Sequence, residues 1–160
     1  MNAADVLRYG HLTLLGSIEG LPKEYWETGG VTGVWSAKDV MAHLASYELV
    51  LVEILSGFTG GGATPLLDQF RDPGESFNDA QVDARAGQSV AETLAELNGA
   101  HERVLALIGQ VPEETARRTG TLPWYGEAYA LEDVIVYLYY GHKREHSAQI
   151  DVFRDGITGG

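Results

Sequence analysis

Residues 36–58 read SAKDVMAHLASYELVLVEILSGF, and this stretch decides the fold class. Its apolar side chains recur every three or four positions, which is the period of one face of an α-helix. They are Val40, Leu44, Tyr47, Leu51, Ile54, Leu55 and Phe58. Ser36 can cap the first free amides of such a helix, and Asp39 three residues later completes a capping box. The stretch therefore predicts a long amphipathic helix that buries one broad face.

Three further segments have the same helical period. The first is a helix of about four turns, with apolar positions at Leu7, Leu14, Leu15 and Ile18 and a stop at Gly20-Leu21-Pro22. Another helix is expected from about Ser89 to Val111, and the last covers roughly 22 residues from Leu131 to Phe153.

Residues 57–86 interrupt this pattern with glycines, Pro65 and Asp72-Pro73-Gly74. We expect a long connection here that can act as a lid, pinned to the body by its apolar side chains. These are Leu66, Leu67, Phe70 and Phe77. No segment shows the sustained alternation of a half-buried strand, so the chain is predicted to be all-α, a four-helix bundle with a long connection between its second and third helices.

The length and charge of the chain exclude several classes of protein. Its 160 residues suit one domain, which we place at residues 1–155, followed by a flexible tail at 156–160. Asp and Glu number 23 against 11 Lys and Arg, a net charge of -12, so we expect no nucleic-acid partner. Without cysteine there is no disulfide, thiolate zinc site or catalytic thiol. The first residues lack signal-peptide features and no apolar stretch is long enough to span a bilayer, which predicts a cytoplasmic protein without a membrane partner.

Three histidines form a candidate metal site. His142 and His146 are one helical turn apart, so their imidazoles can bind the same ion. On the same helical wheel, apolar residues surround His142, namely Leu131, Ile135, Leu138 and Phe153. His43 lies at the edge of the apolar face of residues 36–58, and three imidazoles from two helices would leave metal positions open for water or substrate. The alternative is that each is a buried histidine satisfied by hydrogen bonds.

Three other polar residues are candidates for the same site. His101 lies at the centre of the apolar face of its helix, where it could be a fourth ligand, a residue behind the ligands or a substrate contact. Gln149 could hydrogen-bond an imidazole or orient a water, and a polar interface residue is the alternative. Glu48 could accept a hydrogen bond from a ligand or act as a general base, unless it is simply solvated. Glu48 and Gln149 are therefore the candidate catalytic residues.

The surroundings of this candidate site are less distinctive. The connection at residues 57–86 would shape a substrate mouth, and Trp124 and Tyr125 could line it. Glu145 points about 100° away from the neighbouring histidine, so we expect it at the periphery. For His11 we expect a core histidine with hydrogen-bond partners rather than a ligand.

Two motifs resemble a known family. Residues 35–44 read WSAKDVMAHL, with Glu48 beyond them, and residues 142–150 read HKREHSAQI. Both resemble the DinB-like superfamily, which includes damage-inducible and stress-associated bacterial proteins, bacillithiol S-transferases and the metal-binding domain of mycothiol-dependent maleylpyruvate isomerase. The W-x-x-K-D-x-x-x-H-L element is similar to the DfsB branch.

The resemblance implies a homodimeric four-helix bundle in which a histidine triad binds a divalent metal, zinc or nickel. By motif, this triad is His43, His142 and His146. The implied function is a metal-dependent enzyme of stress response or detoxification, a thiol-dependent S-transferase or a hydrolase. Its substrate would be a small molecule, with a low-molecular-weight thiol as one candidate. The alternative is a non-catalytic stress-associated protein that binds a small molecule or a metal.

Overall fold

The computed structural model describes residues 1–72 and 76–159, and four long helices form its body. They are α1 (Ala3–Gly20), α2 (Ala37–Ser56), α5 (Val90–Ile108) and α8 (His142–Thr158). The shorter elements are η1 (Lys23–Tyr25), α3 (Pro65–Arg71), α4 (Phe77–Ala84), α6 (Glu113–Arg117), α7 (Leu131–Val134) and η2 (Ile135–Gly141). Within the described ranges there is no β-strand, and no helix has both the length and the apolar character to cross a membrane. The predicted all-α bundle is confirmed.

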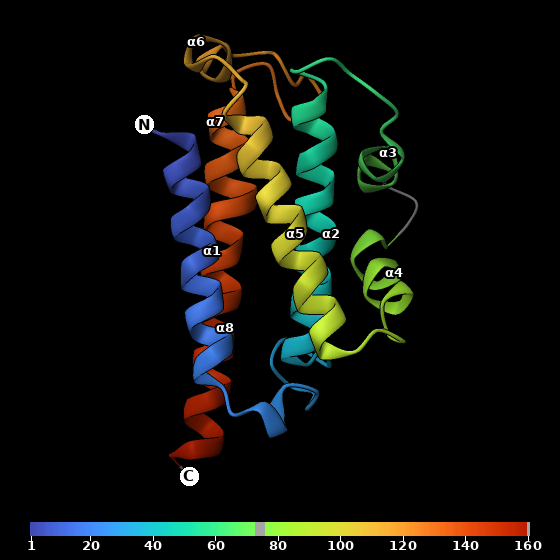
Figure 1. Cartoon of the computed structure of the whole chain (residues 1–160), viewed down its shortest axis with the longest axis vertical. Coiled ribbons are helices and arrows are strands. Elements are labelled where there is room, and N and C mark those ends of the chain that lie inside the picture. The colour runs from blue at the N-terminus through green and yellow to red at the C-terminus, as the bar shows by residue number, and fades with distance from the viewer. Residues whose placement is uncertain (73–75, 160) are drawn as a thin grey trace.

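The long helices pack as two neighbouring pairs. Figure 1 shows α1 beside α8 and α2 beside α5, with α3 and α4 against the outer side of α2. Each long helix contributes side chains that are less than 2% exposed, such as Leu14, Leu51, Leu97 and Ile150. Burying one such side chain stabilises the fold by about 1.5–3 kcal/mol. The apolar faces seen in the sequence are thus the faces that meet in the core.

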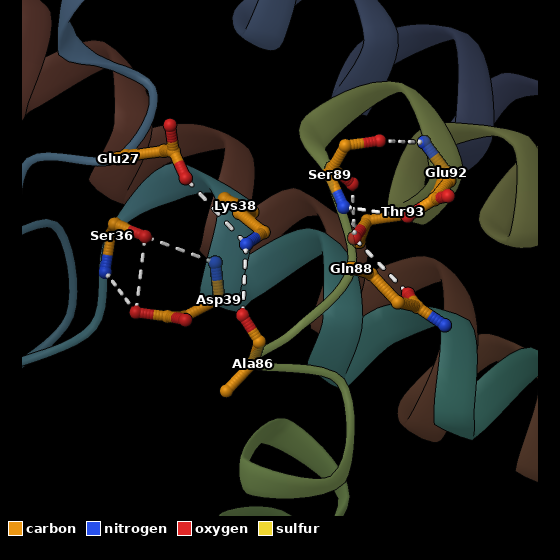
Figure 2. A network of polar contacts seen from close by, with 9 residues as sticks. All are labelled: Glu27, Ser36, Lys38, Asp39, Ala86, Gln88, Ser89, Glu92 and Thr93. Carbon is orange, nitrogen blue, oxygen red and sulfur yellow. Dashed lines mark hydrogen bonds and ion pairs between the residues drawn. The ribbon is translucent and has the colours of Figure 1, made fainter.

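Complete capping boxes begin both α2 and α5. The Asp39 amide donates to Ser36 Oγ at 3.1 Å, and the Ser36 amide donates to the Asp39 carboxylate at 2.9 Å. Ser89 and Glu92 repeat the arrangement at 3.0 and 2.8 Å (Figure 2). Lys38 also donates to a backbone carbonyl of the segment before α5, which ties the two helix starts together. The boxes fix where α2 and α5 begin, and so the position of every later residue along the helix axis.

Residues 57–86 differ from the prediction, because they contain the two short helices α3 and α4 rather than only irregular chain. The first free amides of α3, those of Leu66 and Leu67, donate to the carboxylate of Glu53 on α2 at 3.2 and 2.7 Å. A helix of seven residues is unstable alone, so α3 depends on this contact from outside its own segment. The Pro73-Gly74 part of the predicted interruption lies outside the described residues.

The last predicted helix is one continuous rod whose winding changes. It runs through α7, η2 and α8, and η2 is a π-helix. A π-helix has more residues per turn, so an angle of 100° per residue does not hold across it. Leu138, predicted to face the core, is only half-buried, while Tyr139 is 2% exposed. The rod also runs past the predicted end at Phe153 to Thr158, into the predicted tail.

Candidate metal centre

The three predicted ligands come together between α2 and α8. His142 Nε2 lies 3.0 Å from His43 Nε2 and 2.9 Å from His146 Nε2. The His43 ring meets the other two edge-on, at interplanar angles of 83° and 78°. His43 and His146 are buried, and His142 is half-buried. The capping box of α2 sets the position of His43 along that helix, and the regular winding of α8 keeps His142 and His146 one turn apart.

The outer nitrogens of two of these rings have hydrogen-bond acceptors. His146 Nδ1 lies 2.8 Å from Gln149 Oε1, and the His142 ring hydrogen-bonds the backbone carbonyl of Leu138. An amide or carbonyl oxygen can only accept, so the nitrogen facing it carries the proton. In the neutral rings of His142 and His146, Nε2 therefore presents a lone pair to the centre of the triad.

Burial keeps the triad neutral. It lowers the pKa of His43 to about 3 and that of His142 to about 4, and neighbouring imidazoles add to both shifts. The pKa of His146 is also lowered by burial, against the opposing effects of Gln149 and the negative charge of Glu145. At pH 7 all three rings are in the form that ligates metals.

This donor set fits a divalent metal ion. The Nε2 atoms of His142 and His146 are 2.9 Å apart, and their lone pairs repel each other unless a cation lies between them. Three imidazoles suit zinc, nickel, copper or iron. Among the described residues, this is the group of three or more side chains whose ligand atoms cluster tightly enough to hold an ion. The triad could therefore hold a metal ion.

Thr32 also belongs to this site, although no sequence motif indicates it. Its hydroxyl donates to Gln149 Oε1 at 2.6 Å, so Gln149 is held from the loop before α2 while it contacts His146. The two partners are 117 positions apart in the chain. A threonine in a glycine-rich loop gives no local signal of such a contact.

Glu48 and His101 lie in a second buried cluster. Glu48 forms an ion pair with Lys143, and its other oxygen is 3.4 Å from His101 Nδ1. His11 joins them, since its Nδ1 lies 3.1 Å from Lys143 Nζ, its Nε2 contacts Asn98 and its ring stacks on His101 at 3.8 Å. Burial alone would raise the pKa of Glu48, but Lys143 and His101 hold it at about 2. The prediction for His11, a core histidine with hydrogen-bond partners, is confirmed.

A series of aromatic contacts connects the triad to the outer helices. The Tyr47 ring lies 4.6 Å from that of His142 and 5.4 Å from that of Phe70 on α3. Phe70 contacts Trp124 at 6.3 Å, and Trp124 contacts Tyr125 at 6.0 Å. Trp124 and Tyr125 are thus connected to the triad by ring contacts through Phe70 and Tyr47. The spacing of apolar residues predicts Tyr47 only as part of the core face and does not indicate its place beside the ligand His142.

Two surface hollows lie against the triad and share Glu145. The first hollow, of about 260 Å³, is lined by Tyr47, Tyr137, Leu138, Gly141, His142 and Glu145. The second hollow, of about 350 Å³, is lined by Gly30, Val31, Glu145, Ala148, Gln149, Val152 and Phe153. The first hollow is lined by the ligand His142, and the second is lined by Gln149, which contacts the ligand His146. Glu145, expected at the periphery, belongs to both linings.

The fold and the site define a class, a helical bundle with a three-histidine group that could hold a metal ion. Residues 11–150 match the sequence model of the DinB superfamily, and this span includes all three histidines. The chain therefore belongs to the DinB superfamily, which confirms the resemblance seen in its motifs. No curated protein and no solved structure matches the chain significantly.

Proposed function

We propose that the protein is a divalent-metal-dependent enzyme, a thiol-dependent S-transferase or a hydrolase that acts in stress response or detoxification. Zn²⁺ or Ni²⁺ would be held by His43, His142 and His146. The observation that carries this proposal is the convergence of three Nε2 atoms, with those of His142 and His146 2.9 Å apart. An ion held there would lower the pKa of a coordinated water or thiol, which supplies a nucleophile at neutral pH.

The chain's own residues would orient the ligands and leave the site accessible. Gln149, held by Thr32, keeps Nε2 of His146 turned toward the other ligands. His101 contacts Glu48 rather than the triad, which supports a site with open positions over a closed storage site. We propose that Glu48 acts as a positioning residue through Lys143, the neighbour of a ligand, because its buried carboxylate is paired there. The chain lacks cysteine, so a reacting thiol would come from a cosubstrate.

We also propose a cytoplasmic homodimer. Exposed apolar side chains on α1 support it, namely Tyr9 and Leu12. A second copy could cover this face. Light scattering of the wild type and of Leu12→Lys tests the dimer, which should dissociate in the variant; a wild type that stays monomeric at high concentration would exclude it.

The first test is elemental analysis of protein purified without added metal. We expect about one Zn or Ni per chain, lost in His43→Ala and in His146→Ala. His101→Gln is the matched control, a buried histidine outside the triad, and should retain the metal. No metal, and no uptake of added Zn²⁺ or Ni²⁺, would refute the proposal. Metal binding without turnover of any thiol or ester substrate would favour the non-catalytic binding protein.

A further inference from the structure

Glu145 supplies the one carboxylate among the described residues that line the two hollows beside the triad, and neither lining contains Lys or Arg. The other lining residues are apolar, aromatic or glycine residues, with one amide, that of Gln149, and one imidazole, that of His142. Tyr137 and Leu138 supply apolar surface in the first hollow, and Val152 and Phe153 do so in the second. A ligand in either hollow would thus meet apolar groups and one carboxylate.

The basic residues next to Glu145 in the sequence do not offset its charge in these hollows. Lys143 is 2% exposed and is paired with Glu48 inside the bundle. The Arg144 guanidinium donates to the Tyr140 hydroxyl at 3.2 Å and lies 5.7 Å from the centre of that ring. Neither residue is part of the lining. The chain as a whole, with a net charge of -12, adds to the negative potential.

We propose that Glu145 is a specificity-determining residue, which makes the two hollows beside the triad favour small neutral or cationic molecules with an apolar group over anionic ones. This rests on the proposed function, because it names the ligand class of the same site. Apolar walls provide the driving force for binding, and one fixed charge at the edge of the site discriminates between ligands of similar shape. Glu145 is exposed, so its discrimination is modest and weakens with salt.

The test uses three probes of similar shape: benzylamine, benzyl alcohol and benzoate. Each is titrated into metal-free protein at low salt, and the amide NMR signals of Gly141 and Ala148 report on one hollow each. In metal-free wild type we expect benzylamine to bind most tightly and benzoate least. In Glu145→Gln the ratio of the benzoate to the benzylamine dissociation constant should fall about five-fold or more. Glu102→Gln, which removes an exposed carboxylate on α5, should leave the ratio unchanged.

The outcomes separate this inference from the proposed function. If the ratio is the same in Glu145→Gln and wild type, or falls equally in Glu102→Gln, the inference is wrong. It is also wrong if no probe shifts either signal. If the protein takes up no metal but the ratio still depends on Glu145, the proposed enzyme is refuted and the charge selectivity of the hollows stands.

Discussion

Gln149 Oε1 lies 2.8 Å from Nδ1 of His146 and so determines which nitrogen of that imidazole faces the other two histidines. The Thr32 hydroxyl, 2.6 Å from the same oxygen, restricts the amide to one orientation. A partner behind a metal ligand fixes both the tautomer and the direction of the ring. Two residues that never touch the metal position thereby set its geometry.

Replacing Gln149 should therefore weaken metal binding without removing a ligand. In Gln149→Met the His146 ring loses its acceptor, and we expect about ten-fold weaker Zn²⁺ affinity, measured by competition with a chelating dye. Thr32→Val should cost less, about three-fold, since it acts through Gln149. Thr13→Val is the control, because that hydroxyl bonds only the backbone of its own helix. Wild-type affinity in Gln149→Met would show that the contact does not orient the ligand.

Breaking the buried Glu48–Lys143 pair should be strongly destabilising. Lys143→Met leaves a carboxylate that is fully buried without its cation, and the free energy of unfolding should fall by about 3–5 kcal/mol. Adding Glu48→Gln removes the remaining charge and should restore at least half of the loss. Urea unfolding of the metal-free protein measures both.

An exposed ion pair provides the comparison. Arg8 and Asp5 are more than half exposed, so Arg8→Met should cost less than about 1 kcal/mol. If Lys143→Met costs no more than Arg8→Met, the buried pair does not hold α2 and α8 together. If the double variant is as unstable as the single one, the loss comes from packing rather than from an unpaired charge.

The ligands could be predicted from the sequence because their geometry is local to single helices. His142 and His146 are i and i+4 on the regularly wound α8, and the capping box at Ser36 fixes the start of the helix that carries His43. The spacing of apolar residues then indicates which faces meet. These signals lie within about 20 residues of each ligand, the range in which helical periodicity is informative.

The rest of the site depends on contacts between distant segments. Lys143 lies between His142 and Arg144 and has the sequence signature of a surface residue, and its ion pair with Glu48 joins α8 to α2, far away in the sequence. Thr32 reaches Gln149 only because its loop folds back over α8. For α3 the decisive partner is Glu53, on a different helix. Periodicity within one segment carries no information on any of these.

Acid should destabilise the metal-free protein partly through His11. Burial lowers its pKa to about 3, with added effects of Lys143 and His101 that exceed the opposing effects of Asn98 and Glu48. Between pH 6.5 and 3 the unfolded chain thus binds a proton that the folded protein does not. The free energy of unfolding should fall as the pH is lowered through this range, by up to about 1.4 kcal/mol per unit from this group.

The variant His11→Gln isolates that contribution. Its unfolding free energy, measured in urea with a chelator present, should decline less steeply than that of wild type between pH 6 and 5. Above pH 7, His11 is neutral in both the folded and the unfolded protein. The free energies of unfolding of wild type and variant should therefore change with pH in parallel there. Parallel profiles below pH 6 as well would mean that His11 is protonated in the folded state.

The α3 helix should loosen when its cap on α2 is removed. Glu53→Ala deletes the carboxylate that accepts from the Leu66 and Leu67 amides, and the loss of such a cap is worth about 1 kcal/mol. Amide hydrogen exchange within α3 should quicken about five-fold, while exchange in α5 stays unchanged. Glu19→Ala, at the exposed end of α1, is the control.

Because the Phe70 ring of α3 lies 5.4 Å from the Tyr47 ring beside the triad, Glu53→Ala should also release Zn²⁺ faster than wild type. Faster exchange with unchanged metal release would show that α3 does not cover the metal site.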